Sequence, residues 1–272
     1  MKKFIKKIII GLTPPIITNL MRKTIDSNIH SDEYIDWICS ILGGFLTRGN
    51  ISGFVYAIRH MPSGGAIVEI GSFLGLSTNI IAYLAIKYQR DNQFFTCDPW
   101  AFEGTDRPVG GYFHAESKVY RDYAKKVFIM NTALFSARKL PYTVEAYSYQ
   151  FFKFWNTQFT VKDVFERSVT LGGPISFAYI DGAHDYDMVK KDFYDIDKHL
   201  LSHGFILFDD SAENGGFEGV TKVIDEVKNN PCYKIVFNNP NYLFLHSTVK
   251  CNARSGNFIR CFKSKTFSWS VV

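Results

Sequence analysis

The chain has 272 residues, of which 46% are hydrophobic and 21% are charged, the balance of an ordinary packed protein. Its formal net charge of +5 is mild, and lysines and arginines gather near the two ends of the sequence. We therefore expect no nucleic-acid groove, and no run of about 18 apolar residues predicts a transmembrane helix. The five cysteines form no CxxC pair and no Cys/His cluster with zinc spacing, so we expect unpaired thiols and a cytoplasmic location.

The sequence begins with a basic leader. Residues 1–15 combine lysines with an isoleucine run and end in Pro14-Pro15, which interrupts the apolar run and argues against a signal peptide. Two interpretations stay open. The leader is either an amphipathic segment that rests on an anionic membrane, at its inner face, or a solvated extension.

A helical cap is expected to complete residues 1–60. We place Ser31 as the N-cap of a first helix that ends at Gly43-Gly44. By the helical period its apolar residues share one face: Tyr34, Trp37, Ile38 and Ile41. A second short helix is expected from about Ile51 to Met61, where Pro62 stops it.

From Gly65 the pattern changes to alternating strands and helices, which predicts a doubly wound α/β fold with a mostly parallel sheet. The expected strands are Ala66–Ile70, Phe94–Cys97, Tyr142–Ala146, Ile175–Ile180 and Phe205–Phe208. Helices are expected at Leu76–Tyr88 and around 189–200 and 220–227. The last two apolar runs, Tyr233–Phe237 and Tyr242–His246, are so close that they predict an antiparallel hairpin. We assign residues 61–247 to this domain, with a helical lid inserted at about 101–140 and a basic tail at 248–272.

A glycine turn follows the first expected strand, within Val68–Thr78. Gly71 and Gly75 let the backbone approach a ligand where a Cβ would collide. The helix after the turn offers its N–H groups to a carboxylate, with Ser77 or Thr78 as local hydrogen-bonding groups. The spacing Glu-x-Gly-x-x-x-Gly differs from the dinucleotide fingerprint G-x-G-x-x-G.

The second expected strand ends in a carboxylate, Asp98. Such a residue can accept hydrogen bonds from both hydroxyls of a ribose in nucleoside-binding α/β folds. Together with the glycine turn, Asp98 predicts an adenosine-containing ligand.

Acidic residues also follow the fourth and fifth strands, at Asp181 and at Asp209-Asp210. Because the first and fourth strands flank the topological switch point, Asp181 should lie beside Gly71. Three gathered carboxylates repel one another unless a cation or proton is present, and their oxygens suit Mg²⁺, Mn²⁺ or Ca²⁺. The alternative is that these acids cap helices or pair with basic side chains.

A histidine near the first of these acids is the candidate proton acceptor. This residue is His184, and histidine side chains, which in general titrate near neutrality, can take a proton from a hydroxyl. A structural hydrogen bond to a helix end is the alternative role. His114, in the expected lid, is a second candidate.

Together these motifs resemble the class I S-adenosylmethionine-dependent methyltransferases, nearest the branch with catechol, caffeoyl-CoA and macrocin-type sugar O-methyltransferases. The resemblance covers about residues 64–247 and implies a seven-stranded sheet whose last hairpin supplies the one antiparallel strand. It implies these cofactor-binding residues: Glu69, Gly71, Ser72, Gly75, Ser77, Asp98, Ser148 and Asp181. In the metal-dependent branch, the acids matching Asp181, Asp209 and Asp210 hold a divalent ion. The family's base is often Lys or Asp, whereas this chain offers His184.

The resemblance implies methyl transfer to an oxygen of a small molecule, with Asp181 and His184 as catalytic residues and Mg²⁺ or Mn²⁺ as the ion. A sugar or glycan is the first choice of acceptor, because sugar-modifying relatives share the Asp-Gly-x-His pattern and basic leaders with Pro-Pro. Besides this acceptor we expect no nucleic acid, a peripheral membrane contact through the leader, and leave a homo-oligomer open. The alternatives are an NAD-dependent sugar-modifying enzyme and a non-catalytic nucleoside-binding partner protein.

Overall fold

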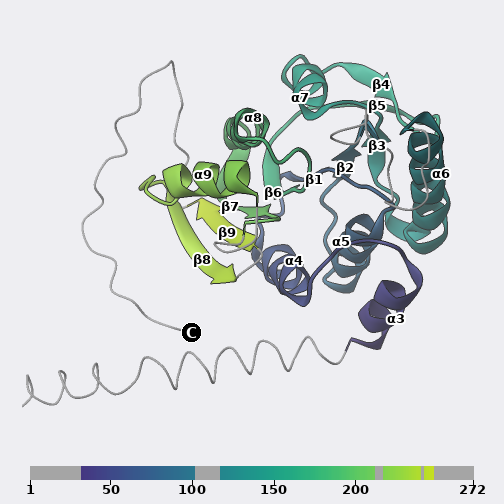
Figure 1. Ribbon diagram of the computed structural model, residues 1–272, viewed down its shortest axis with the longest axis horizontal. Coiled ribbons are helices and arrows are strands. Elements are labelled where there is room, and N and C mark those ends of the chain that lie inside the picture. Colours follow the sequence, from purple (N-terminus) through teal and green to yellow (C-terminus); the bar gives the residue numbers. More distant parts are fainter. Residues whose placement is uncertain (1–31, 102–116, 212–216, 240–241, 248–272) are drawn as a thin grey trace, which may run out of the picture.

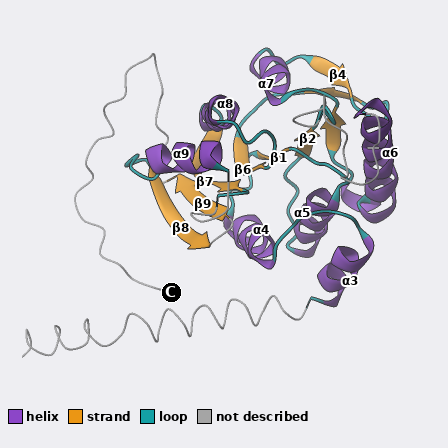
Figure 2. Ribbon diagram, viewed as in Figure 1, coloured by secondary structure: helices purple, strands orange, loops and turns teal. Residues whose placement is uncertain are grey.

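The computed structural model describes residues 32–101, 117–211, 217–239 and 242–247. Within them a sheet lies between two layers of helices (Figure 1, Figure 2). The helices are α3 Glu33–Ile41, α4 Arg48–His60, α5 Leu76–Lys87, α6 Ser117–Phe135, α7 Ser148–Asn156, α8 Tyr186–Asp197 and α9 Glu218–Val227, with a 3₁₀ turn at Ala137–Lys139. The strands are β1 Ala66–Ile70, β2 Phe94–Cys97, β3 Tyr142–Val144, β4 Thr160–Lys162, β5 Ser168–Thr170, β6 Ile175–Ile180, β7 Leu200–Phe208, β8 Tyr233–Asn239 and β9 Tyr242–Ser247.

The main sheet has seven strands in the order β3-β2-β1-β6-β7-β9-β8. Within this sheet the neighbours β3, β2, β1, β6 and β7 pair in parallel. Strand β9 is antiparallel to both of its neighbours, β7 and β8. The expected fold class and terminal hairpin are confirmed. Because β1 and β6 are neighbours, the chain winds outward from them in two directions, and the ends of these strands form the switch point where ligands bind in such sheets.

The alternation of side chains along each strand divides the core into two parts. One side of the sheet, with Ile67 and Phe177, packs against α3, α4 and α5. The other side, with Val68 and Ala178, packs against α7, α8 and α9. Both faces are covered, which is why β1, β2 and β6 read as continuous apolar runs rather than alternating ones.

The N-terminal helices differ in detail from the sequence prediction. The N-cap of α3 is Asp32, whose side chain accepts a hydrogen bond from the Ile35 N–H at 3.3 Å, and Ser31 lies outside the described residues. Helix α3 packs with Ile35 and Ile38 inward. Trp37 and Ile41, predicted to share a face with Ile38, are 49% and 47% exposed, whereas Ile38 is buried.

Helix α4 begins three residues earlier than expected. Thr47 is its N-cap and forms a capping box with Asn50, in which each side chain receives the other residue's backbone N–H. The prediction placed the start at the first strongly apolar residue, Ile51, and so missed this polar first turn. The consequence is that Asn50 is buried at the N-terminus of α4.

Several further expectations are corrected or lie outside the described residues. Strand β7 begins at Leu200 rather than Phe205, and α7 and the β4–β5 hairpin were not expected. Cys39 and Cys97 are free thiols, whereas Cys232 is disulfide-bonded. The expectation of unpaired thiols is therefore wrong for Cys232. Sequence spacing reveals only cysteine pairs that are close in the chain. Of the predicted lid, α6 is described; residues 102–116, the leader and the tail 248–272 are not.

None of the helices in the described ranges is long and apolar enough to span a membrane.

Candidate active site

The glycine turn lies between β1 and α5 and requires both of its glycines. Gly71 and Gly75 have φ values of +83° and +89°, in the left-handed region that favours glycine. A Cβ on Gly71 would lie 2.0 Å from the carbonyl oxygen of Asp181, so no larger residue fits there. The predicted contact between Gly71 and Asp181 is confirmed.

Glu69 and Ser77 lie beneath this turn. The Glu69 side chain is fully buried, and its two carboxyl oxygens accept hydrogen bonds of 2.5 Å from the hydroxyls of Ser77 and Thr78. Burial raises the pKa of Glu69 to about 8, so the carboxyl is mostly protonated at neutral pH. Glu69 therefore ties β1 to the first turn of α5, and its contact with a cofactor stays a prediction, as does that of Ser77.

Asp98 closes the turn from the end of β2. One of its oxygens accepts from the backbone N–H groups of Ser72 and Phe73, at 2.7 and 2.9 Å, and the other accepts from Trp100 N–H at 2.6 Å. Burial raises the pKa of Asp98, and these three N–H groups oppose that rise. Asp98 holds the loop in shape from the position predicted for ribose binding, and Ser72 contributes to the loop through its backbone.

Ser148, one of the predicted cofactor-binding residues, is the buried first residue of α7. It faces Asp192, a residue of α8 that is only 1% exposed. Burial raises the pKa of Asp192 to about 7, and the Ser148 hydroxyl opposes that rise. Asp192 is a buried ionisable group beside this region that the sequence pattern gave no reason to single out.

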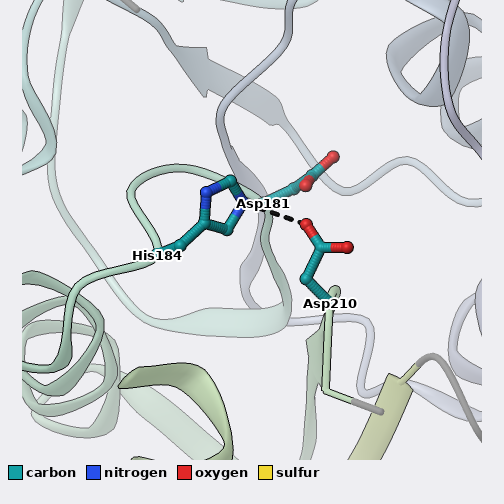
Figure 3. Close-up of side chains that lie close together, drawn as sticks. All are labelled: Asp181, His184 and Asp210. Carbon is teal, nitrogen blue, oxygen red and sulfur yellow. Dashed lines mark ion pairs between the residues drawn. The ribbon is translucent and has the colours of Figure 1, made fainter. Parts of the chain in front are cut away.

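The acids after β6 and β7 meet because these strands are parallel neighbours. Asp181, His184 and Asp210 each offer an atom to a common point, and these atoms lie within 4.8 Å of one another (Figure 3). The His184 Nε2 is 2.9 Å from an Asp210 carboxylate oxygen. Figure 3 shows the His184 ring between its loop and Asp210. We call these three residues the acid–histidine cluster.

Asp209 lies close enough to Asp181 to raise the pKa of that residue, but it is not among the residues whose ligand atoms converge. Its oxygens accept hydrogen bonds from the Tyr179 hydroxyl at 2.5 Å, the Asn50 amide at 2.9 Å and the Asp210 N–H at 2.8 Å. The predicted metal set of Asp181, Asp209 and Asp210 thus differs from the set whose ligand atoms converge, in which His184 takes the place of Asp209. The reason is that consecutive residues leave a strand end in different directions.

Two residues of this region were missed by sequence reasoning. Tyr179 points to the same side of β6 as Asp181, and its hydroxyl oxygen, which donates to Asp209, also lies 3.2 Å from an Asp181 carboxyl oxygen. The two-residue spacing was a signal that could have revealed it. Asn50 reaches Asp209 across 159 positions of sequence, a contact for which the sequence gives no local signal.

Burial and like charges together set the electrostatics of the cluster. Burial, and then the neighbouring carboxylates Asp209, Asp210 and Glu69, raise the pKa of Asp181 well above its usual range. The His184 ring stacks on Phe217, with 3.9 Å between ring centres and 10° between planes. Asp181 therefore favours a proton or a cation beside it, while His184 is held in place by Asp210 on one side and Phe217 on the other. His114 lies outside the described residues.

The comparisons with known proteins agree with this geometry. Residues 68–211, over half of the 272-residue chain, match the model of a family described as a methyltransferase domain. A search of curated proteins found no match.

Several solved structures share the fold. A putative caffeoyl-CoA O-methyltransferase from Staphylococcus aureus is 16% identical, with 83% of this chain and 98% of that chain covered and a TM-score of 0.54. An O-methyltransferase from Bacillus cereus, in complex with SAH, is 10% identical, with 82% and 90% covered and a TM-score of 0.51. TomG from Streptomyces achromogenes, in complex with SAM, is 12% identical, with 75% and 82% covered and a TM-score of 0.50. At these identities the likeness shows the fold alone.

The family match does not favour the NAD-dependent enzyme or the non-catalytic partner protein that the sequence left open. The fold, the glycine turn and the family model together show that the chain belongs to this methyltransferase family and is a class I S-adenosylmethionine-dependent methyltransferase.

Proposed function

We propose that this enzyme methylates a hydroxyl oxygen of a sugar or glycan and uses a divalent cation to do so. The observation that carries the proposal is the acid–histidine cluster, Asp181, His184 and Asp210, beside the glycine turn. Because Asp181 contacts Gly71 through its backbone, an acceptor bound at the cluster would lie next to the methyl donor. Holding the two reactants in this orientation is expected to supply much of the rate acceleration.

His184 is the proposed proton acceptor. Asp210, 2.9 Å away, stabilises the imidazolium that forms when His184 takes the acceptor's proton, and Phe217 restricts rotation of the ring. Deprotonation makes the acceptor oxygen a better nucleophile toward the sulfonium-bound methyl group. Asp181 would orient the acceptor hydroxyl from the side of the glycine turn.

The donor set fits a divalent cation. The carboxylates of Asp181 and Asp210 supply the hard oxygens that Mg²⁺ and Mn²⁺ prefer, and His184 beside them would stay available to accept the proton. Such an ion lowers the pKa of a hydroxyl that binds to it. A bound cation would also relieve the repulsion that keeps the pKa of Asp181 high.

A hydroxyl-rich acceptor suits the surroundings of the cluster. The side chains of His184 and Asp210 are partly exposed, so they can accept hydrogen bonds from a sugar's hydroxyls. Phe217, 47% exposed, offers an aromatic face for the apolar C–H groups of a sugar ring. The resemblance to sugar O-methyltransferases in the Asp-Gly-x-His segment points in the same direction.

The experiment is methyl transfer from radiolabelled S-adenosylmethionine to a panel of sugars, sugar nucleotides and catechols, with EDTA and with added Mg²⁺ or Mn²⁺. We expect transfer to a sugar hydroxyl that EDTA suppresses and Mn²⁺ restores. Mn²⁺ binding, followed by electron paramagnetic resonance, should be lost in Asp210→Asn and retained in Asp187→Asn, an exposed acid on α8. Full activity in EDTA would reject the cation, and transfer only to catechols would reject the sugar.

A further inference from the structure

An apolar stripe covers the outward side of α6. Its four members are strongly exposed: Val119 at 59%, Tyr123 at 54%, Met130 at 70% and Leu134 at 70%. Their spacing keeps them on one side of the helix, opposite the buried residues Ala124 and Phe128. Single exposed apolar residues are common, but a stripe along a whole helix marks an interaction surface.

Helix α3 extends this stripe. Trp37 and Ile41 are half exposed, and the Trp37 ring lies edge-on to Phe135 of α6, with 5.7 Å between ring centres. Figure 1 shows α3 and α6 on the same side of the molecule. We call the six residues Trp37, Ile41, Val119, Tyr123, Met130 and Leu134 the apolar face.

Basic side chains accompany the apolar face. Lys118, Lys126 and Arg138 are exposed, and none of them forms an ion pair with another described residue. Asp122 is the only acid within α6. On α3, Asp36 is paired with Arg48, which leaves Glu33 as the exposed acid. An apolar stripe flanked by lysine and arginine is typical of helices that lie in the surface of an anionic membrane.

We propose that the apolar face docks on an anionic lipid surface. A second copy of the chain is the other candidate, but in a twofold dimer this face would meet itself and bring the basic side chains together. Anionic headgroups would neutralise them instead. Trp37 and Tyr123 are residue types that favour the membrane–water boundary.

This orientation has a consequence for the enzyme. The inward side of α6 packs on the glycine turn, where a Cβ on Gly75 would lie 3.2 Å from Phe128 and 3.3 Å from Thr132. Lipid docking would therefore place a helix that supports the cofactor loop at the membrane surface. The inference goes beyond the proposed acceptor and does not depend on it.

The test is sedimentation of the full-length protein with phosphatidylcholine vesicles, with and without phosphatidylglycerol. Wild type should bind the anionic vesicles, and less so at high salt, which screens the basic side chains. The double variant Met130→Glu/Leu134→Glu should lose binding by at least about tenfold. Phe159→Glu, at an apolar site before β4 that is 54% exposed, is the control outside the apolar face and should bind like wild type.

Unchanged binding of the double variant would assign the lipid contact to other parts of the chain and overturn the proposal. A wild-type dimer in vesicle-free buffer that the double variant breaks would also overturn it, in favour of a self-interface. Unchanged S-adenosylmethionine affinity, measured by calorimetry, shows that the variant is folded. Should it fail to fold, Lys118→Glu/Lys126→Glu serves instead, and its loss of preference for phosphatidylglycerol supports the proposal whereas retention contradicts it.

Discussion

The two halves of the active site differ in how completely their polar groups are satisfied. Around the glycine turn, the carboxyl oxygens of Glu69 and Asp98 all accept hydrogen bonds from hydroxyls or backbone N–H groups. Around the acid–histidine cluster, burial and neighbouring carboxylates act on Asp181, and among the described residues His184 pairs with Asp210. The two carboxyl groups of the first region are satisfied without a ligand, although the buried Ser72 hydroxyl there has no partner among the described residues, whereas the second region gains from a ligand.

This difference separates binding from chemistry. A loop whose donors and acceptors are already paired is held rigid, so it can bind a methyl donor with little reorganisation. A cluster of like charges favours whatever neutralises it, here a proton or a cation, and so it is suited to proton transfer. Substitutions in the two regions should therefore affect different steps.

Replacing His184 by alanine should give the largest effect, because it removes the proton acceptor and leaves Asp210 without its partner. We expect kcat to fall by about 10²–10⁴-fold. S-adenosylmethionine affinity should stay within about threefold, since His184 belongs to the second region. Initial rates and calorimetry measure the two quantities.

His60→Ala, at the exposed end of α4, is the control and should leave both quantities unchanged. A parallel loss of cofactor affinity in His184→Ala would show that the two regions are not separate.

Replacing Asp98 by alanine should mainly weaken S-adenosylmethionine binding, in contrast to the loss of kcat expected for His184→Ala. The change removes the predicted ribose acceptor and leaves the Ser72 and Phe73 N–H groups without their partner. We expect S-adenosylmethionine binding to weaken by about 2–4 kcal/mol, the scale of charge-assisted hydrogen bonds. Calorimetry measures the change, and a folded variant that binds normally would contradict the ribose assignment.

The part of the fold that positions the site could be predicted from sequence. The strands β1, β2 and β6 are buried on both faces, so each appears as an apolar run followed by a turn. The β4–β5 hairpin could not be predicted, because its strands have three residues each and are mostly exposed. Helix α7 was missed because its N-cap, Tyr147, is not a residue type that marks a helix start.

The site was predictable where it depends on strand ends and not where it depends on tertiary contacts. Asp181 and Asp210 follow apolar strands, so their convergence followed from the parallel sheet. The orientation of Asp209 depends on Asn50, which comes from a distant helix. The burial of Asp192 depends in the same way on how α8 packs, which a local pattern does not reveal.

Asp192 gives the expected pH dependence of stability. Burial raises its pKa to about 7 in the folded chain, above its ordinary value of 3.8. The unfolded chain therefore ionises first, so the free energy of unfolding should fall as pH rises through this window and level off above pH 7. Asp192→Asn cannot ionise, so near pH 8 it should be more stable than wild type by roughly 1–4 kcal/mol.

Urea unfolding at several pH values from about 4 to about 8 measures this effect. Glu69 contributes a fall of the same sign toward its own pKa of about 8, so only the difference between variant and wild type is informative. A constant difference across the range would show that Asp192 is ionised in the folded chain.

Substitutions of Asn50 test whether helix α4 supports the residues around the acid–histidine cluster. Their effect on stability should be the smallest of those predicted here. Its amide nitrogen donates to Asp209 at 2.9 Å, while its amide oxygen accepts the Thr47 N–H at 3.0 Å. Asn50→Ala removes both contacts and should lower the free energy of unfolding by about 1–2 kcal/mol.

Asn50→Asp keeps an acceptor for Thr47 but places a carboxylate against Asp209, so the Asp209 contact becomes repulsive. If Asn50 mainly caps α4, the Asp variant should be nearly as stable as wild type. We expect instead that it is less stable than the Ala variant at pH 8 and recovers on acidification, because protonation of either carboxyl removes the repulsion. Denaturant unfolding of both variants at two pH values decides between the two roles.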